Sequence, residues 1–292
     1  MQTEPVLSRF VQEIRDDLAG DELLCPTFVD ASLRARLALK NPGLSTSELA
    51  RVVAGEPVLS ARIVALANGA SLQRGGKQVR DVRSAVTRIG QEAVCNVAIA
   101  IALQQITHAR ELEPFRAQAQ SIWEHSLEVA AMAHVIGSHR QGISPDDAMF
   151  VGLVHDIGHL YSMWRAAQIP DLVRRPEQLK TLVHDLHPTV GAALIRRMQI
   201  PDAIAVAVLE HELDPGTLAP GSLSRLLSVA NRCANSPAAG SDVADSALTG
   251  SLTAEADPPK PQEGLDEAAA HTLLRENLGD LAWLVATMRG QR

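Results

Sequence analysis

Aromatic residues are scarce in this 292-residue sequence, where they make up only 3%. The three cysteines, Cys25, Cys95 and Cys233, lie far apart and form no CxxC pair. This spacing excludes a disulfide framework or a zinc ribbon and favours a reducing compartment. Acidic residues outnumber basic ones by 34 to 27, so the sequence also lacks the basic excess of proteins that bind a phosphate backbone. We therefore expect no direct binding to nucleic acid.

Long hydrophobic runs are also absent. The first ten residues contain Glu4 and Pro5, where an export signal needs an apolar segment. The longest apolar run, from Val97 to Leu103, is too short to cross a bilayer. We therefore expect a cytoplasmic protein without a membrane segment.

What the sequence does contain is Ala, Leu, Val and Ile at helical spacings. Ser45-Thr46-Ser47-Glu48 has the pattern of a capping box at the start of a helix. Gly90 is suited to end a helix, and residues 91–107 are so apolar that we expect a helix buried on most sides. No alternating segment of usable strand length is found. The sequence predicts an all-α fold.

Changes in polarity predict how these helices are organised. We expect two helical lobes, residues 5–115 and 116–235, packed as one unit with residues 94–103 near their contact. Residues 236–264 are rich in proline and polar residues and predict a flexible linker. Residues 265–289 predict an amphipathic helix that docks either on the chain's own core or on a partner, such as a second copy in a homodimer. Its apolar stripe consists of Leu274, Leu278, Leu281, Val285 and Met288.

Histidine is concentrated in one part of the chain, since eight of the ten histidines lie between residues 125 and 211. Several share a helical face with apolar residues and should point inward, where an unpaired polar group is costly. Two arrangements would satisfy them. They converge on a divalent ion, as in the metal sites of helix bundles, or they form a buried hydrogen-bonded network. The inward-facing residues are His125, His155, Asp156, His187 and His211.

Four segments, WEHSLEVA, GLVHDIGHL, HPTVGAALI and LEHE, resemble in this order the HD superfamily of metal-dependent phosphohydrolases. Upstream, LSTSELARVVAGEPVLSARIVALANGA and VRDVRSAVTRIG resemble the N-terminal lobe of the HDOD domain, a bacterial signalling relative of these enzymes. The resemblance covers roughly residues 15–235. It implies a two-lobed helical HDOD domain with a regulatory role, here followed by the C-terminal helix.

Carried over by position, the resemblance implies metal ligands at His125, His155, Asp156, His187 and His211. Imidazoles and a carboxylate together suit borderline cations, and they do not choose among iron, manganese and zinc.

The sequence departs from catalytic HD proteins at four places. His159 stands where they have a lysine, and Glu210-His211 stands where HD-GYP phosphodiesterases have a His-His pair. Glu210 is still a carboxylate that suits a hard cation. No GYP sequence follows residues 214–216, and Asn231 lies close to where the closing aspartate is expected.

These departures weaken both metal retention and the positive charge that phosphate hydrolysis needs. We therefore expect a non-catalytic signalling module that binds a protein partner or a small ligand such as a nucleotide second messenger. The alternative is a divalent-metal phosphohydrolase or phosphodiesterase acting on a nucleotide.

Overall fold

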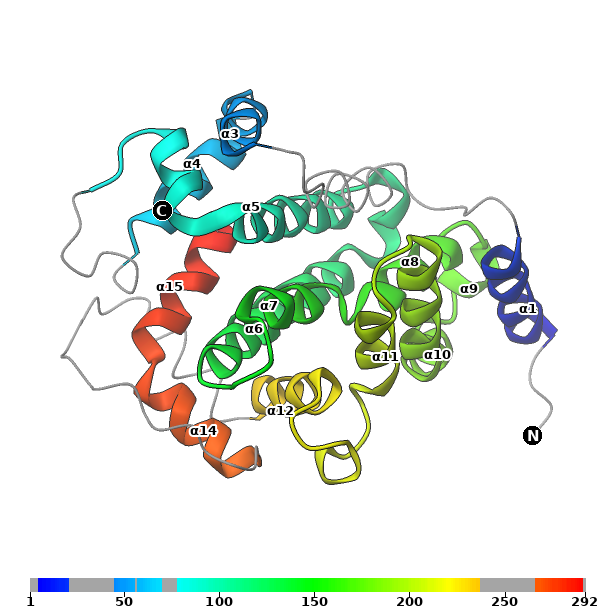
Figure 1. Ribbon diagram of the computed structural model, residues 1–292. Coiled ribbons are helices and arrows are strands. Elements are labelled where there is room, and N and C mark those ends of the chain that lie inside the picture. Colours follow the sequence, from blue (N-terminus) through cyan, green and yellow to red (C-terminus); the bar gives the residue numbers. More distant parts are fainter. Residues whose placement is uncertain (1–4, 21–44, 56, 70–77, 237–265, 291–292) are drawn as a thin grey trace.

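The computed structural model describes residues 5–20, 45–55, 57–69, 78–236 and 266–290, and these residues contain helices and no strand. The predicted all-α fold is therefore confirmed (Figure 1). In chain order the elements are α1 (Pro5–Ala19), α3 (Thr46–Ala54), α4 (Pro57–Ala67), α5 (Val82–Thr107), the 3-10 helix η2 (Arg110–Phe115), α6 (Arg116–Ser138), α7 (Pro145–Val154), α8 (Ile157–Ala166), α9 (Pro170–Val173), α10 (Pro176–Arg197), α11 (Asp202–Glu210), the 3-10 helix η3 (Pro215–Thr217), α12 (Leu223–Asn235), α14 (Glu267–Glu276) and α15 (Leu278–Arg289). The predicted linker, residues 236–264, lies outside the described residues apart from Ser236, as does Cys25.

Two local sequence signals are found where the sequence predicts them. Ser45 caps α3, accepting from the backbone of Glu48, whose side chain in turn accepts from the backbone of Ser45 at 2.9 Å. Gly90 has φ +83° and interrupts the helical geometry of α5. This left-handed conformation suits glycine because it has no Cβ. The chain therefore bends at Gly90 before the apolar part of α5 begins.

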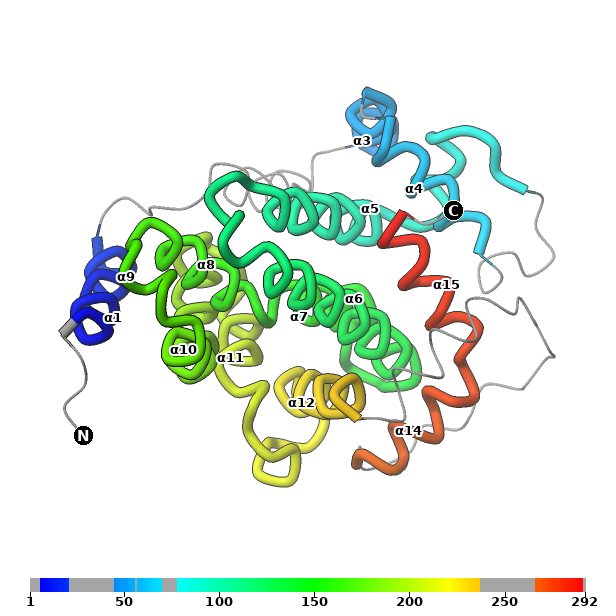
Figure 2. Tube along the Cα trace, turned by 180° about the vertical axis from the view of Figure 1, so that it is seen from behind, coloured from blue at the N-terminus to red at the C-terminus, as the bar shows by residue number. Residues whose placement is uncertain are grey.

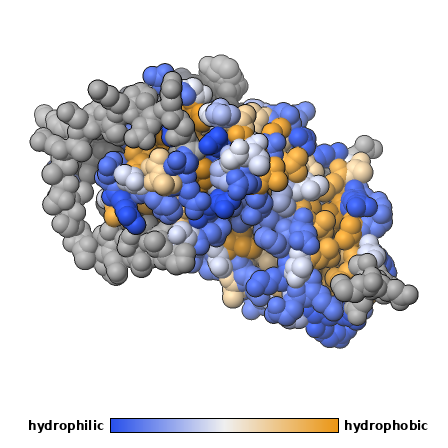
Figure 3. All heavy atoms as spheres, turned by 90° about the horizontal axis from the view of Figure 1, so that it is seen from below, coloured by the Kyte–Doolittle hydropathy of each residue, from blue (hydrophilic) through white to orange (hydrophobic). Residues whose placement is uncertain are grey.

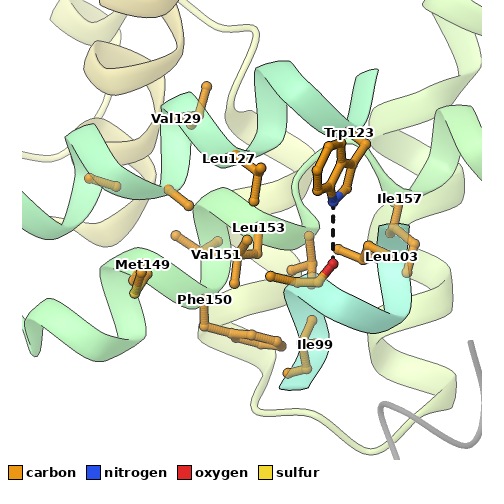
Figure 4. Close-up of a cluster of buried hydrophobic side chains, with 14 of the residues drawn as sticks. Ile99, Leu103, Trp123, Leu127, Val129, Met149, Phe150, Val151, Leu153 and Ile157 are labelled. Atoms are coloured by element: carbon orange, nitrogen blue, oxygen red, sulfur yellow. Dashed lines mark hydrogen bonds between the residues drawn. The ribbon is translucent and has the colours of Figure 1, made fainter. Parts of the chain in front are cut away.

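Helix α5 joins the N-terminal helices α3 and α4 to the helices that follow it. Ile99 and Leu103 of α5 lie in the same hydrophobic cluster as Trp123 of α6 and Phe150 of α7 (Figure 4). The indole of Trp123 donates to the Ala100 carbonyl at 3.2 Å. Since α5 contacts α3, α4, α6 and α7, its apolar residues form part of one continuous core.

Helix α5 is also long and apolar enough, by length and composition, to cross a membrane. Half of its most apolar window is nevertheless buried inside the protein. Its fully buried residues include Val94, Val97 and Ala100. This burial is typical of a core helix. On the face of the molecule shown in Figure 3, hydrophilic residues surround smaller apolar patches.

The C-terminal segment forms two helices, broken at Asn277, rather than one. Figures 1 and 2 show α14 and α15 along one side of the molecule, leading from α12 to the N-terminal helices. Four of the five residues of the predicted stripe are buried, and Leu278 is partly buried. Arg62 of α4 donates to the carbonyl oxygens of Met288 and Arg289 at the end of α15, where a cation is favourable. The stripe therefore docks on the chain's own core.

The shared core generates a prediction about the lobe boundary at residue 115. A fragment of residues 1–115 would expose the surface of α5 that α6 and α7 cover, and a large apolar patch promotes association. We expect the fragment to aggregate or to lack a cooperative melting transition, whereas the full chain melts cooperatively. Size-exclusion chromatography and circular dichroism test this. A soluble, monomeric and folded fragment would show that the N-terminal lobe is an independent domain.

Candidate metal centre

The structure brings together all five residues singled out in the sequence. His125 lies on α6, His155 and Asp156 lie at the junction of α7 and α8, His187 lies on α10, and His211 follows α11. The ring of His155 lies 5.3 Å from that of His125 and 5.0 Å from that of His211, measured between centroids. Except for His125, which is partly exposed, these residues are buried. Four segments far apart in the chain thus meet at one buried cluster.

Glycine allows the helices to come close enough for this convergence. A Cβ on Gly158 would lie 2.1 Å from the carbonyl oxygen of His187 and 2.8 Å from the amide nitrogen of Gly191. Helices α8 and α10 therefore touch through their backbones, immediately beside Asp156 and His187. A Cβ on Gly152 would similarly lie 2.5 Å from the Cα of Ala130, so α7 packs equally closely on α6.

Hydrogen bonds to backbone carbonyls fix the orientation of each of three imidazole rings. The Nδ1 atoms of His155 and His211 lie 2.8 Å and 2.6 Å from the carbonyl oxygens of Gly152 and Val208, and Nδ1 of His187 bonds the carbonyl of His184 in the same way. Because a carbonyl oxygen only accepts, each Nδ1 carries a hydrogen. In a neutral ring Nε2 then carries no hydrogen and has a free lone pair. Such backbone support of the second ring nitrogen is common in metal-binding histidines.

The Nε2 atoms gather around the carboxylate of Asp156. Nε2 of His187 lies 3.4 Å from Oδ1 and that of His211 lies 3.7 Å from it, while Nε2 of His155 lies 3.4 Å from Oδ2. The Nε2 atoms of His187 and His211 are 3.1 Å apart. Two lone pairs at this distance repel each other unless a proton or a metal ion lies between them. Among the described residues, the buried Nε2 of His155 has no hydrogen-bond partner. The donor set therefore fits a cation.

A carboxylate that sequence reasoning missed also reaches the cluster. Oε1 of Glu212 lies 3.3 Å from Nε2 of His211 and 3.8 Å from Nε2 of His187. The sequence pointed instead to Glu210, which is the last residue of α11. Glu212 lies beyond the end of α11, so helical periodicity does not predict where its side chain points. The chain turns directly after α11, and this turn brings Glu212 to the site.

Asn231 lies in the cluster, as expected for a residue that replaces the closing aspartate. Its Oδ1 accepts from Nε2 of His125 at 2.8 Å, and its Nδ2 donates to Oε1 of Glu212 at 3.2 Å. In this arrangement Nε2 of His125 carries a hydrogen and presents no lone pair. His125 therefore differs from the other three histidines in that its Nε2 is hydrogen-bonded to Asn231, and ligand atoms of His125, His155 and Asp156 lie within 4.8 Å of one another.

The rings of two further histidines, His159 and His184, stack on the ring of His187. Nδ1 of His159 bonds Oδ1 of Asp156 at 3.2 Å, and its ring stacks on His187 with centroids 3.8 Å apart. His159 is thus held against Asp156 and His187. His184 is exposed, as expected from the sequence.

The charges of the cluster follow from burial and hydrogen bonding. Burial lowers the pKa of His155 to about 4 and that of His187 to about 3, so both rings are neutral at pH 7. Burial disfavours the charged form of Asp156, but the charge of His155 and the hydrogen bond from His159 outweigh it and hold the pKa of Asp156 well below its usual range.

His211 and Glu212 form a coupled pair. Burial opposes protonation of His211, but the hydrogen bond with Glu212 and the charge of Asp156 outweigh it and raise the pKa of His211. The same hydrogen bond lowers the pKa of Glu212 to about 2. When His211 is protonated, the proton on its Nε2 faces Asp156 and Glu212, which lie 3.7 and 3.3 Å away.

An all-α fold with a buried His-Asp pair and converging histidines defines an HD-type helical protein. The HDOD domain model matches residues 25–213, more than half of the chain. The chain therefore belongs to the HDOD family.

Solved structures with this fold come from several bacteria. A candidate metal-dependent phosphohydrolase from Shewanella amazonensis is 22% identical, with 97% of this chain and 98% of that chain covered and a TM-score of 0.71. An HDOD domain protein of unknown function from Geobacter sulfurreducens is 21% identical over 97% and 99% of the two chains, with a TM-score of 0.58. A candidate signal transduction protein from Marinobacter aquaeolei is 18% identical over 97% and 66%, with a TM-score of 0.55. No match was found among curated proteins.

The close contact of α8 and α10 generates a prediction. Gly158→Ala would push its Cβ into the backbone of His187, which cannot move aside as a side chain would. Overpacking of this kind costs about 1–3 kcal/mol. We expect a clearly lower melting temperature, together with weakened metal binding. Gly55→Ala is the control, because Gly55 is exposed and has an ordinary φ of −72°. Equal melting temperatures for the two variants would contradict the proposed role of Gly158.

Proposed function

We propose that this HDOD protein is a signalling module that acts by binding, with a divalent metal ion supporting its HD-type cluster. The main support is the character of the side chains that bond to the cluster, which are histidines, carboxylates and the amide of Asn231. Hydrolysis of a phosphoester needs positive charge that faces the developing negative charge. His159 stands at the position of the lysine, and its Nδ1 is hydrogen-bonded to Asp156.

The surface beside the cluster is suited to binding. Leu209 and Leu213 flank His211 and Glu212 and are 39% and 50% exposed. Large exposed apolar side chains next to a polar cluster are typical of a contact surface for a protein or a ligand. A change of ligand or ion at the cluster would act on α8, α10 and α11 together, because all three meet there. We propose that the partner is a signalling protein and that a nucleotide second messenger is a candidate ligand.

Phosphohydrolase activity remains the second candidate function, and Glu212 is the observation that favours it. Glu212 supplies a carboxylate at a site where Asn231 has removed one. A metal ion held by these residues would supply a bound water of lowered pKa.

Metal content tests the first part of the proposal. We expect the purified protein to contain exchangeable iron, manganese or zinc and the His155→Ala, Asp156→Ala double variant to contain almost none. Elemental analysis of both proteins, purified in parallel, measures this. Adding metal to the chelated wild-type protein should raise its melting temperature, because an ion that binds only the folded state stabilises it. Equal metal content in the two proteins would contradict metal binding at the cluster and favour the alternative, a buried hydrogen-bonded network.

A second measurement separates the two candidate functions. We expect at most trace hydrolysis of cyclic dinucleotides, (p)ppGpp and nucleoside monophosphates in the presence of Mn²⁺, Fe²⁺ or Zn²⁺, because His159 and Asn231 stand where catalytic relatives are expected to have a lysine and an aspartate. The same substrates, tested for a shift in melting temperature, show whether any of them binds. Turnover of about 1 per second, within the usual range for enzymes, that is lost in the double variant would make the protein a phosphohydrolase.

A further inference from the structure

The charge at the cluster does not follow the pattern expected from the HD resemblance. Asn231 brings no negative charge to the place where the closing aspartate is expected. Glu212 brings a carboxylate to the same place, since its Oε1 accepts a hydrogen bond from Asn231 at 3.2 Å. The negative charge at this place therefore comes from the turn that follows α11 rather than from α12.

The donor atoms have the spacing of a coordination shell. A tetrahedral ion with bonds of about 2.0–2.1 Å holds its ligand atoms about 3.3 Å apart. Nε2 of His187, Nε2 of His211 and Oδ1 of Asp156 are separated by 3.1, 3.4 and 3.7 Å. Oε1 of Glu212 lies 3.3 Å and 3.8 Å from the two nitrogens. These five separations, from 3.1 to 3.8 Å, are close to the spacing of ligand atoms around one ion.

Helix α12 holds Glu212 in this position from two sides. Nδ2 of Asn231 donates to its carboxylate, and Oγ of the fully buried Ser228 donates to the carbonyl of the next residue, Leu213, at 2.7 Å. Ser228 and Asn231 lie three residues apart and therefore share one face of α12. The turn that carries Glu212 is thus fixed at its backbone and at its side chain.

On this geometry we propose that Glu212 is a direct metal ligand, completing a set of two imidazoles and two carboxylates with Asp156, His187 and His211. The proposal rests on the metal binding proposed above. Two carboxylates balance the charge of a divalent ion, and the loss of either one leaves a net positive charge in a largely buried cluster. Asn231 is then a positioning residue that orients Glu212 and His125. Because the side chain of Glu212 is 45% exposed, this side of the cluster is open to solvent.

The competing arrangement is one in which Glu212 only pairs with protonated His211. Both arrangements use the same hydrogen bonds when no ion is bound. They differ in what Glu212 contributes when a metal is added, and metal affinity therefore distinguishes them.

The experiment compares Glu212→Gln with Glu210→Gln in the full chain. Both variants remove one negative charge from the same stretch of chain, but Glu210 lies on α11 whereas Glu212 reaches the cluster. Co²⁺ is the probe, since its visible absorption reports the number and type of its ligands. Zn²⁺ affinity is measured by competition with a chelator. Circular dichroism confirms that each variant is folded.

We expect Glu212→Gln to weaken Zn²⁺ binding at least 100-fold and to change the Co²⁺ spectrum, with Glu210→Gln within about twofold of wild type. Loss of a residue that only supports a metal ligand lowers metal affinity about 10–100-fold. We expect Asn231→Ala to lower Zn²⁺ affinity within that range and to leave the types of ligand reported by the Co²⁺ spectrum unchanged. A Glu212→Gln variant with wild-type affinity and spectrum would overturn the proposal while leaving the metal site intact. A wild-type protein that binds neither ion would overturn both proposals.

Discussion

The burial of Asp156 is the constraint on which the cluster depends. A carboxylate 7% exposed inside a helical protein is costly unless opposite charges or hydrogen bonds satisfy it. The partners come from separate segments, namely His155 at the end of α7, His159 on α8 and His187 on α10. These helices must therefore pack in one fixed arrangement for the carboxylate to be satisfied. The backbone contact at Gly158 is one way in which the sequence achieves this placement.

The sequence predicts much of this arrangement, because helical periodicity identifies inward-facing residues. It predicts the capping box at Ser45, the interruption at Gly90 and the five residues that meet at the cluster. It does not predict Glu212, whose position depends on a turn after α11 rather than on a helical face. Nor does it show that His125 donates to Asn231, because hydrogen-bond direction depends on side-chain orientation. Periodicity thus describes helices well and the residues just beyond their ends poorly.

The same distinction applies to the C-terminal segment. Its stripe of apolar residues continues at helical spacing through Asn277, so the sequence predicts a single helix where the structure has two. The break lets α14 contact α12 while α15 reaches α4 and α5. Arg62 then binds the carbonyl oxygens at the end of α15. The segment therefore connects the helices around the cluster to the N-terminal helices through its own packing.

The second carboxylate of the cluster, that of Glu212, lies where contacts at the protein surface can reach it. An aspartate on α12 would be part of a helix within the core, whereas Glu212 belongs to a half-exposed turn beside the exposed Leu209 and Leu213. A partner or ligand that contacts this turn would move a group that bonds both His211 and Asn231. If the protein acts by binding as proposed, surface binding and the state of the buried cluster would be coupled through this one side chain. Such a coupling would suit a protein that transmits a signal.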